Sequence, residues 1–144
     1  MKTPLLTLLT SLVLASAAVA QTNAFKPIHA KIDLKDGDTL VFLGDSITHQ
    51  CLYTQYVEDY FYTRFPKMRI RFHNAGVGGD RATNALVRFD DDVAAFKPAY
   101  ITILLGMNDG SYRDFDKAVF DTYQRDMTLL LDRISTLEIG RAHV

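Results

Sequence analysis

The sequence predicts an α/β fold built on a parallel β-sheet. Three short segments have the length and pattern of β-strands: the apolar runs 39–43 and 100–105 and the alternating segment 69–73. Each run is followed by a glycine-containing turn and then by a longer segment whose apolar residues recur with helical spacing. A repeated order of strand and helix favours a parallel sheet with right-handed crossovers.

The first strand and the helix after it have clear sequence limits. The strand is preceded by the turn-forming segment 36–38 and ends at Gly44, and Pro66 ends the helix. The apolar positions of this helix are Tyr53, Tyr56, Val57, Tyr60, Phe61 and Phe65. Because of the helical spacing, we expect Tyr53, Tyr56 and Tyr60 to belong to the core.

The other two strands are expected to have different surroundings. In residues 69–73, Arg69, Arg71 and His73 alternate with Ile70 and Phe72, which indicates an edge strand with one solvated face and a solvated His73. Residues 100–105 are almost wholly apolar, which is typical of a central strand covered on both faces.

Two more helices complete the predicted order. The helix that follows the second strand ends before Pro98 and has the apolar stripe Ala82, Leu86, Phe89, Val93 and Phe96. The last helix has the apolar positions Val119, Phe120, Tyr123, Met127, Leu130, Leu131 and Ile134.

Composition excludes several classes of protein. The 144 residues are enough for one domain with a core, and 48% hydrophobic with 23% charged residues is typical of a globular protein. The net charge of −1 gives no support to nucleic-acid binding, which requires a basic surface. The four histidines and Cys51 show no metal-ligand spacing, so we expect neither a metal nor an organic cofactor. Composition leaves the oligomeric state open.

The N-terminal end has the features of a signal peptide. Residues 1–20 begin with Lys2, continue with an apolar stretch over 5–14, and end in Ala18-Val19-Ala20 before Gln21. The apolar stretch is short for a membrane span and contains threonine and serine. We therefore expect cleavage after residue 20 and an exported protein, periplasmic or extracellular, without stable membrane insertion.

The last seven residues have a different origin. Residues 138–144, EIGRAHV, correspond to the translation of GAG ATC GGA AGA GCA CAC GTC, the start of a common sequencing-library adapter. We therefore divide the chain into the signal peptide 1–20, an N-terminal extension 21–37, a domain portion 38–137 and adapter-derived residues 138–144. About two further βα units, on the order of 60 residues, would be needed to cover residues 100–105. In this chain we expect that strand to be an exposed edge.

Residues suited to acyl transfer follow the carboxyl end of each predicted strand. These residues are Ser46, Gly79 and Asn108, and in a parallel sheet the three strand ends lie at one edge. Ser46 is a candidate nucleophile. The backbone N–H groups of Ser46 and Gly79 and the side-chain amide of Asn108 are the kinds of donor that stabilise an oxyanion.

Three segments carry a resemblance to a known family. GDSIT at 44–48, NAGVGGD at 74–80 and GMND at 106–109 resemble the first three signature blocks of the SGNH (GDSL-type) hydrolases. The resemblance covers about residues 38–137, with the blocks in the right order. It implies a flavodoxin-like three-layer α/β/α sandwich and ester hydrolysis through a covalent acyl-enzyme. It also implies that Ser46 is the nucleophile and that Ser46, Gly79 and Asn108 form the oxyanion hole.

The sequence departs from this family in its catalytic base. The last family block is Asp-x-x-His, and no aspartate here is followed three positions later by histidine. We expect His29 to lie on the surface and His49 to point away from Ser46 or toward a substrate, while His143 belongs to the adapter-derived residues. The catalytic His and Asp are therefore absent from this chain, and we expect the fragment to be inactive.

Other readings of the glycine-rich segments are weaker. A dinucleotide-binding Gly-x-Gly-x-x-Gly motif would need a glycine where Arg81 stands. The sequence has neither a Gly-Lys-Ser/Thr phosphate loop nor a Gly-x-Ser-x-Gly elbow. The alternative that remains is a non-catalytic SGNH-like module that binds glycans, which a full-length gene without Asp-x-x-His would favour.

The sequence restricts the substrate only to a class. Export and the slightly acidic composition favour an acetyl or other short acyl ester on a carbohydrate over a cytoplasmic thioester. Tyr53, Tyr56, Tyr60 and Tyr112 are the aromatic residues that could line a sugar site. We therefore expect a small-molecule or glycan ester as the partner.

Overall fold

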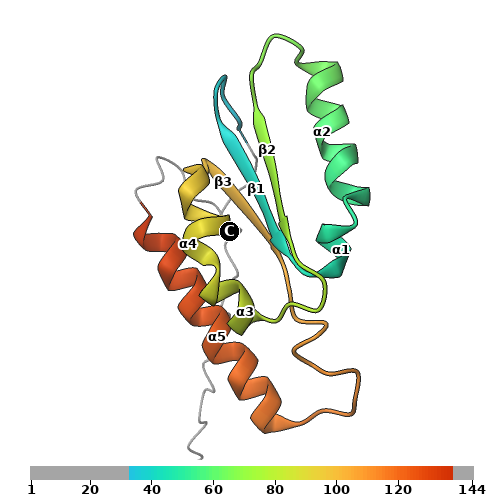
Figure 1. The fold of residues 1–144 in the computed structure, drawn as a ribbon, viewed down its shortest axis with the longest axis vertical. Helices are drawn as coiled ribbons and strands as arrows, with labels where there is room; N and C mark the ends of the chain where they lie inside the picture. The colour runs from blue at the N-terminus through green and yellow to red at the C-terminus, as the bar shows by residue number, and fades with distance from the viewer. Residues whose placement is uncertain (1–32, 138–144) are drawn as a thin grey trace, which may run out of the picture.

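A computed structural model describes residues 33–137 of the chain, so the predicted signal peptide and the residues predicted to be adapter-derived lie outside the described part. Three strands alternate with helices along these residues (Figure 1). The order is β1 (Thr39–Gly44), α1 (Ser46–His49), α2 (Leu52–Arg64), β2 (Arg71–Gly76), α3 (Ala82–Val87), α4 (Phe89–Asp92), the 3-10 turn η1 (Ala94–Phe96), β3 (Tyr100–Leu104) and α5 (Lys117–Thr136).

The strands form one parallel sheet, as predicted, in the order β2-β1-β3. Gly44 at the carboxyl end of β1 pairs with Gly76 at the end of β2 and with Leu104 at the end of β3. All three strands therefore stop at the same level, and the loops that follow them emerge side by side at one edge of the sheet.

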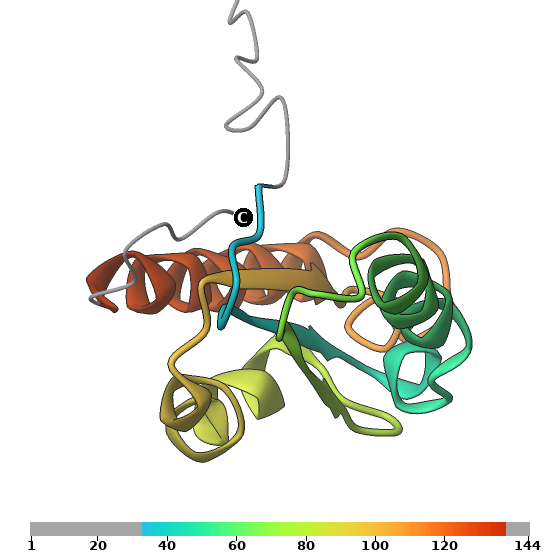
Figure 2. The same cartoon turned by 90° about the horizontal axis from the view of Figure 1, so that it is seen from above.

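The sheet is covered on both faces, because side chains of β1 alternate between them. Val41 and Leu43 pack with residues of α3, α4 and α5, whereas Leu40 and Phe42 pack with residues of α2. Figures 1 and 2 show α2 on one side of the sheet and α3, α4 and α5 on the opposite side. The result is the three-layer α/β/α arrangement that the family resemblance implies.

Two predicted helices are interrupted. The first breaks between α1 and α2 at Cys51, whose φ of 64° is left-handed and cannot continue a right-handed helix. The second breaks into α3, α4 and η1, and Arg88 lies at its first break with φ −96° and ψ 6°. A stripe of helical spacing conceals such breaks, because the short successive turns still bury Ala82, Phe89 and Val93. Phe96, the last residue of the predicted stripe, is 41% exposed.

The second strand lies further along the chain than predicted. β2 begins at Arg71 and runs to Gly76, because each of its residues pairs with one of β1. Arg69 lies outside the strand and forms an ion pair with Asp36. That pair holds the pKa of Asp36 at about 2. His73 is half-buried rather than solvated, since its ring stacks on Phe96 with 3.5 Å between ring centroids.

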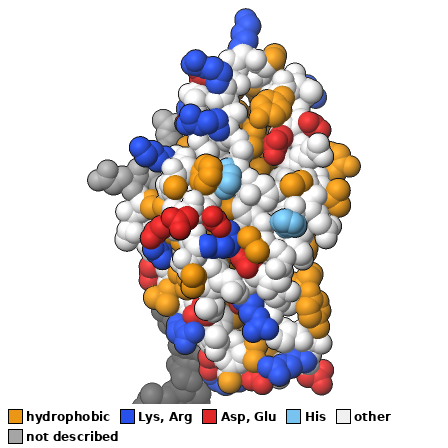
Figure 3. Space-filling model, in the orientation of Figure 1, with side chains coloured by type: hydrophobic (Ala, Val, Ile, Leu, Met, Phe, Trp, Pro, Cys, Tyr) orange, Lys and Arg blue, Asp and Glu red, His pale blue; other side chains and the backbone are white. Residues whose placement is uncertain are grey.

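The expectation that three tyrosines of the first helix belong to the core is correct only for Tyr53. Tyr53 contacts Phe42 edge-on, with 5.9 Å between ring centroids, whereas Tyr56 is 77% exposed and Tyr60 is also exposed. Tyr53, Val57 and Phe61, four residues apart, form the face of α2 that packs on the sheet. Figure 3 shows hydrophobic side chains exposed along α2, away from this face.

β3 is the edge strand opposite β2 in the described sheet, as expected for this chain, and the side chain of Leu104 at its end is 42% exposed. Among residues 33–137, no helix has both the length and the apolar character needed to cross a membrane.

Candidate active site

Ser46 lies at the first helical position after β1, and the local sequence explains why. Asp45 is buried and caps α1, since its side chain accepts a hydrogen bond from the N–H of Ile47 at 3.0 Å. Gly44 leaves room for Thr48, because a Cβ at position 44 would be 2.1 Å from the Thr48 hydroxyl oxygen. The segment Gly-Asp-Ser therefore turns the chain sharply and leaves Ser46 at the strand end.

The end of β2 supports the same short helix. A Cβ on Gly76 would be 2.2 Å from the backbone nitrogen of His49, so only glycine permits α1 to pack against this strand end. The Nδ1 atom of His49 lies 3.1 Å from the Gly76 carbonyl oxygen. Because a carbonyl only accepts, Nδ1 carries the proton of this hydrogen bond. The His49 side chain thus contacts the end of β2, and no hydrogen bond joins this side chain to Ser46.

Gly79 lies in the exposed loop between β2 and α3, and its backbone is left-handed with φ 83°. A Cβ atom at Gly78 or Gly79 would meet nothing within 4 Å, so a lack of room for a side chain does not explain why either residue is glycine. Of these two glycines only Gly79 has a positive φ, and this backbone conformation sets the direction of its N–H bond.

We expect Gly79→Ala and Gly78→Ala to differ sharply although both add one methyl group. In Gly79→Ala the left-handed backbone should lower the free energy of unfolding by about 1–2 kcal/mol. It should also reduce kcat, because relief of the strain moves the N–H group. Gly78→Ala, the matched control, should leave both unchanged. Urea unfolding and steady-state kinetics of the full-length protein measure the difference, and equal effects of the two substitutions would contradict it.

Asn108 connects all three loops. Its side-chain Nδ2 donates a hydrogen bond of 2.9 Å to the carbonyl oxygen of Asp80, which follows Gly79 in sequence. The same atom lies 3.4 Å from Oδ2 of Asp45, which precedes Ser46. The structure therefore brings the loops of the three predicted site residues together through direct contacts of one amide group.

The two N–H groups of the Asn108 amide differ in the strength of their hydrogen bonds. An asparagine amide carries two N–H donors. One is engaged by Asp80, whereas the other has only the long contact with Asp45. The second N–H therefore lacks a strong acceptor, as the predicted role of Asn108 as an oxyanion donor requires.

The neighbouring Asp109 reinforces the connection between the second and third loops. Its Oδ1 accepts a hydrogen bond of 3.0 Å from the backbone N–H of Ala82, at the start of α3. Asp109 is buried, and its Oδ2 has no hydrogen-bond partner in the described part of the chain. Sequence reasoning missed this residue, although an acidic side chain beside Asn108 in a strand-end loop was visible.

The Ser46 hydroxyl has no hydrogen-bond partner among residues 33–137, so no described residue is placed as its general base. His49 contacts Gly76 and His73 stacks on Phe96, while burial lowers the pKa of His73. His29 and His143 lie outside the described residues. The described part of the chain thus contains the predicted nucleophile and the predicted oxyanion donors, but no histidine in it is placed to activate the serine.

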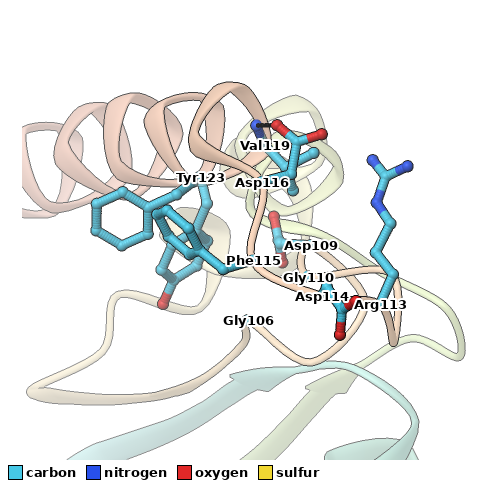
Figure 4. Close-up of a pocket in the computed structure, with 10 residues that line it drawn as sticks. Gly106, Asp109, Gly110, Arg113, Asp114, Phe115, Asp116, Val119 and Tyr123 are labelled. Carbon is cyan, nitrogen blue, oxygen red and sulfur yellow. Dashed lines mark hydrogen bonds between the residues drawn. The ribbon is translucent and has the colours of Figure 1, made fainter.

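An apolar cleft of about 420 Å³ lies between the loop that follows β3 and the start of α5. Gly106 and Asp109, which lie on either side of Asn108, form one wall, and Phe115, Val119 and Tyr123 line the other (Figure 4). Tyr112 is exposed on the same loop, with its hydroxyl 3.5 Å from Oδ1 of Asn108. In residues 33–137, no three His, Cys, Asp or Glu side chains are grouped closely enough to hold a metal ion.

Known proteins resemble this chain in sequence and in fold. The sequence matches the GDSL-like Lipase/Acylhydrolase family over residues 42–141. An acetylxylan esterase of Geobacillus stearothermophilus is 31% identical over 96 residues, which are 56% of this chain and 43% of that protein. Solved catalytic mutants of an acetylxylan esterase from the same organism replace a serine, an aspartate or a histidine, and the histidine lies three positions after the aspartate.

Two solved structures show the same fold. A gut microbial diltiazem-metabolizing enzyme matches with a TM-score of 0.73 and 31% identity over 80% of this chain and 28% of its own. The acetylxylan esterase structure matches with a TM-score of 0.64 and 27% identity over 74% of this chain and 58% of its own. The chain thus spans less than two thirds of the length of each relative. Because the family match covers more than half of the chain, the protein belongs to the GDSL-like lipase/acylhydrolase family and has its SGNH-type α/β fold.

Proposed function

We propose that the full-length protein is a serine esterase that removes acyl groups, and acetyl groups in particular, from carbohydrates. The observation that carries the proposal is the contact of the Asn108 amide with both Asp80 and Asp45. This contact joins the loop of Asn108 to the residues that follow Gly79 and precede Ser46. Family membership and the similarity to an acetylxylan esterase support the reaction class and the carbohydrate ester.

In the proposed reaction, the Ser46 hydroxyl oxygen attacks the ester carbonyl carbon and passes its proton to a base. The resulting oxyanion accepts hydrogen bonds from the N–H groups of Ser46 and Gly79 and from the Asn108 amide. Collapse of the intermediate releases the alcohol and leaves an acyl group on Ser46. Water then attacks the acyl-enzyme and releases the acid.

The base is the missing component, and we propose that it lies in the part of the full-length protein outside this chain. A histidine three positions after an aspartate, as in the catalytic mutants of the related esterase, would take the proton from Ser46. The chain as it stands would then be inactive. The oxyanion donors are neutral, so the proposed reaction needs neither a metal ion nor an organic cofactor.

We further propose that the protein is exported after cleavage between Ala20 and Gln21, and N-terminal sequencing of the mature protein would locate that cleavage. Export would place the enzyme where polymeric or oligomeric carbohydrates occur. Figure 3 shows acidic and basic side chains interspersed over the face that it displays, which suits an uncharged substrate.

The product of the natural gene tests the proposed function. It should release acetate from acetylated xylooligosaccharides and hydrolyse p-nitrophenyl acetate at a rate that exhaustive chelation does not change. Activity lost on chelation and restored only by added metal would contradict the mechanism. Binding of xylooligosaccharides without hydrolysis of either ester would instead favour the glycan-binding module.

A further inference from the structure

Arg88 is a largely buried cation with several partners near the three loops. It lies between α3 and α4, and its side chain is only 16% exposed. The guanidinium NH2 nitrogen donates to the carbonyl oxygens of Ala75 at 2.8 Å and Gly44 at 3.3 Å. Arg88 therefore contacts the carboxyl ends of both β1 and β2.

The same guanidinium holds the second loop. Its Nε lies 2.7 Å from Oδ2 of Asp80, and its NH1 nitrogen lies 3.0 Å from Oδ2 of Asp92. Asp80 is buried, so this ion pair is largely shielded from solvent. Arginine suits such a place because its donors form a rigid planar fork, which can reach several acceptors at once.

Asp80 connects Arg88 to the proposed oxyanion hole through two contacts. Its carboxylate is bound by Arg88, and its carbonyl oxygen accepts the hydrogen bond from Nδ2 of Asn108. Gly79, whose N–H is a second proposed donor, immediately precedes Asp80 in the chain. A shift of Asp80 would therefore move both donors relative to Ser46.

We infer that Arg88 is a positioning residue for the oxyanion hole, acting through Asp80 on the side-chain amide of Asn108. The inference rests on the proposed esterase function for its kinetic consequence and on the described contacts for its structural one. Arg88 touches no reacting atom; its role is to fix the strand ends and the second loop in one arrangement. A lysine would keep the charge, but all its N–H donors are on one nitrogen, which cannot span Asp80 and both carbonyl oxygens.

The chain offers a matched control in Arg133. This arginine of α5 donates to the carbonyl oxygen of Leu86 at 3.0 Å, forms an ion pair with Asp90 and lies over the ring of Phe89. Its contacts resemble those of Arg88 in kind, but none of them involves the three strand-end loops. Arg133→Lys therefore measures how the loss of a comparable set of arginine contacts affects the fold when the strand-end loops are not involved.

The kinetic experiment compares Arg88→Lys, Arg133→Lys, Asn108→Ala and the double variant in the full-length protein with p-nitrophenyl acetate. Arg88→Lys should lower kcat about 10–100-fold, less than outright removal of a donor, with KM changed less than about threefold. In the Asn108→Ala background it should cause almost no further loss, because its effect passes through that amide. Arg133→Lys should leave kcat unchanged.

A second measurement does not depend on catalysis. In ¹⁵N-labelled protein, the side-chain amide of Asn108 is identified as the resonance pair lost in Asn108→Ala. Arg88→Lys should shift that pair and speed the exchange of the proton held by Asp80, whereas Arg133→Lys should not. If wild-type protein proves inactive, the proposed esterase fails while this arm still tests the positioning role. If Arg88→Lys does not fold, Asp80→Asn, which keeps the carbonyl oxygen and loses the ion pair, should give the same spectral change.

Three results would overturn the inference. One is an unchanged Asn108 resonance in a folded Arg88→Lys protein or, if that protein does not fold, in Asp80→Asn. Another is a kcat loss that multiplies with that of Asn108→Ala, which would make the two effects independent. The third is an equal loss of kcat in Arg133→Lys, which would indicate general destabilisation of the fold.

Discussion

Ser46→Ala in the full-length protein should abolish labelling by a serine-directed fluorophosphonate and reduce kcat by on the order of 10⁶-fold. The substitution removes the hydroxyl oxygen that we propose forms the acyl-enzyme at the end of β1. It should not unfold the protein, because Asp45 still caps α1 and the Ser46 hydroxyl makes no hydrogen bond with another described residue. Intact-protein mass spectrometry measures the labelling, and circular dichroism checks the fold.

Ser111→Ala is the matched control for this experiment. Ser111 is a half-buried serine on the third loop, and its hydroxyl lies 3.5 Å from the carbonyl oxygen of Asp109. This variant should be labelled as fully as wild type. Labelling of Ser46→Ala at undiminished stoichiometry, or its loss in Ser111→Ala, would refute the assignment of Ser46 as nucleophile.

Asn108→Ala should lower kcat by about 10²–10³-fold, equivalent to about 2.7–4 kcal/mol of transition-state stabilisation. The N–H with only a long contact to Asp45 gains a full partner once the oxyanion forms. The ester substrate carries no such charge, so KM should change much less than kcat. Steady-state kinetics with p-nitrophenyl acetate separates the two constants.

Asn84→Ala provides the comparison for Asn108→Ala. Asn84 lies in the first turn of α3, and its side chain accepts a hydrogen bond from the N–H of Arg81 at 3.1 Å. Its loss should weaken the start of α3 by about 1 kcal/mol and leave kcat nearly unchanged. A variant of Asn108 that raises KM with an intact kcat would show that the amide binds substrate and does not stabilise the transition state.

Where sequence and structure agree, the signals are local. The run 39–43 is apolar and stops at Gly-Asp-Ser, so a buried strand, a capped turn and a serine at the strand end follow from neighbouring residues. The parallel sheet follows because each strand is joined to the next through a helical segment. The role of Ser46 as nucleophile stays a prediction until it is tested.

Where they differ, the cause lies in contacts between distant segments. The broken second helix has Arg88 at its first break, and this side chain reaches Gly44, which is 44 positions away. Tyr56 and Tyr60 repeat with helical spacing, yet α2 turns only the face of Tyr53 toward the sheet. Spacing identifies a helix, but packing alone determines which of its faces is buried.

The sequence by itself determined the alternation of strands and helices and the three strand-end loops that contain Ser46, Gly79 and Asn108. Only the tertiary structure decided how those loops hold one another: Asn108 donates to Asp80, 28 positions away, and Arg88 binds the carboxylate of that same Asp80. The physical reason is that the two kinds of interaction act over different separations along the chain. Strand, turn and cap preferences act over a few residues, whereas a hydrogen bond between loops exists only after the sheet has aligned the strand ends.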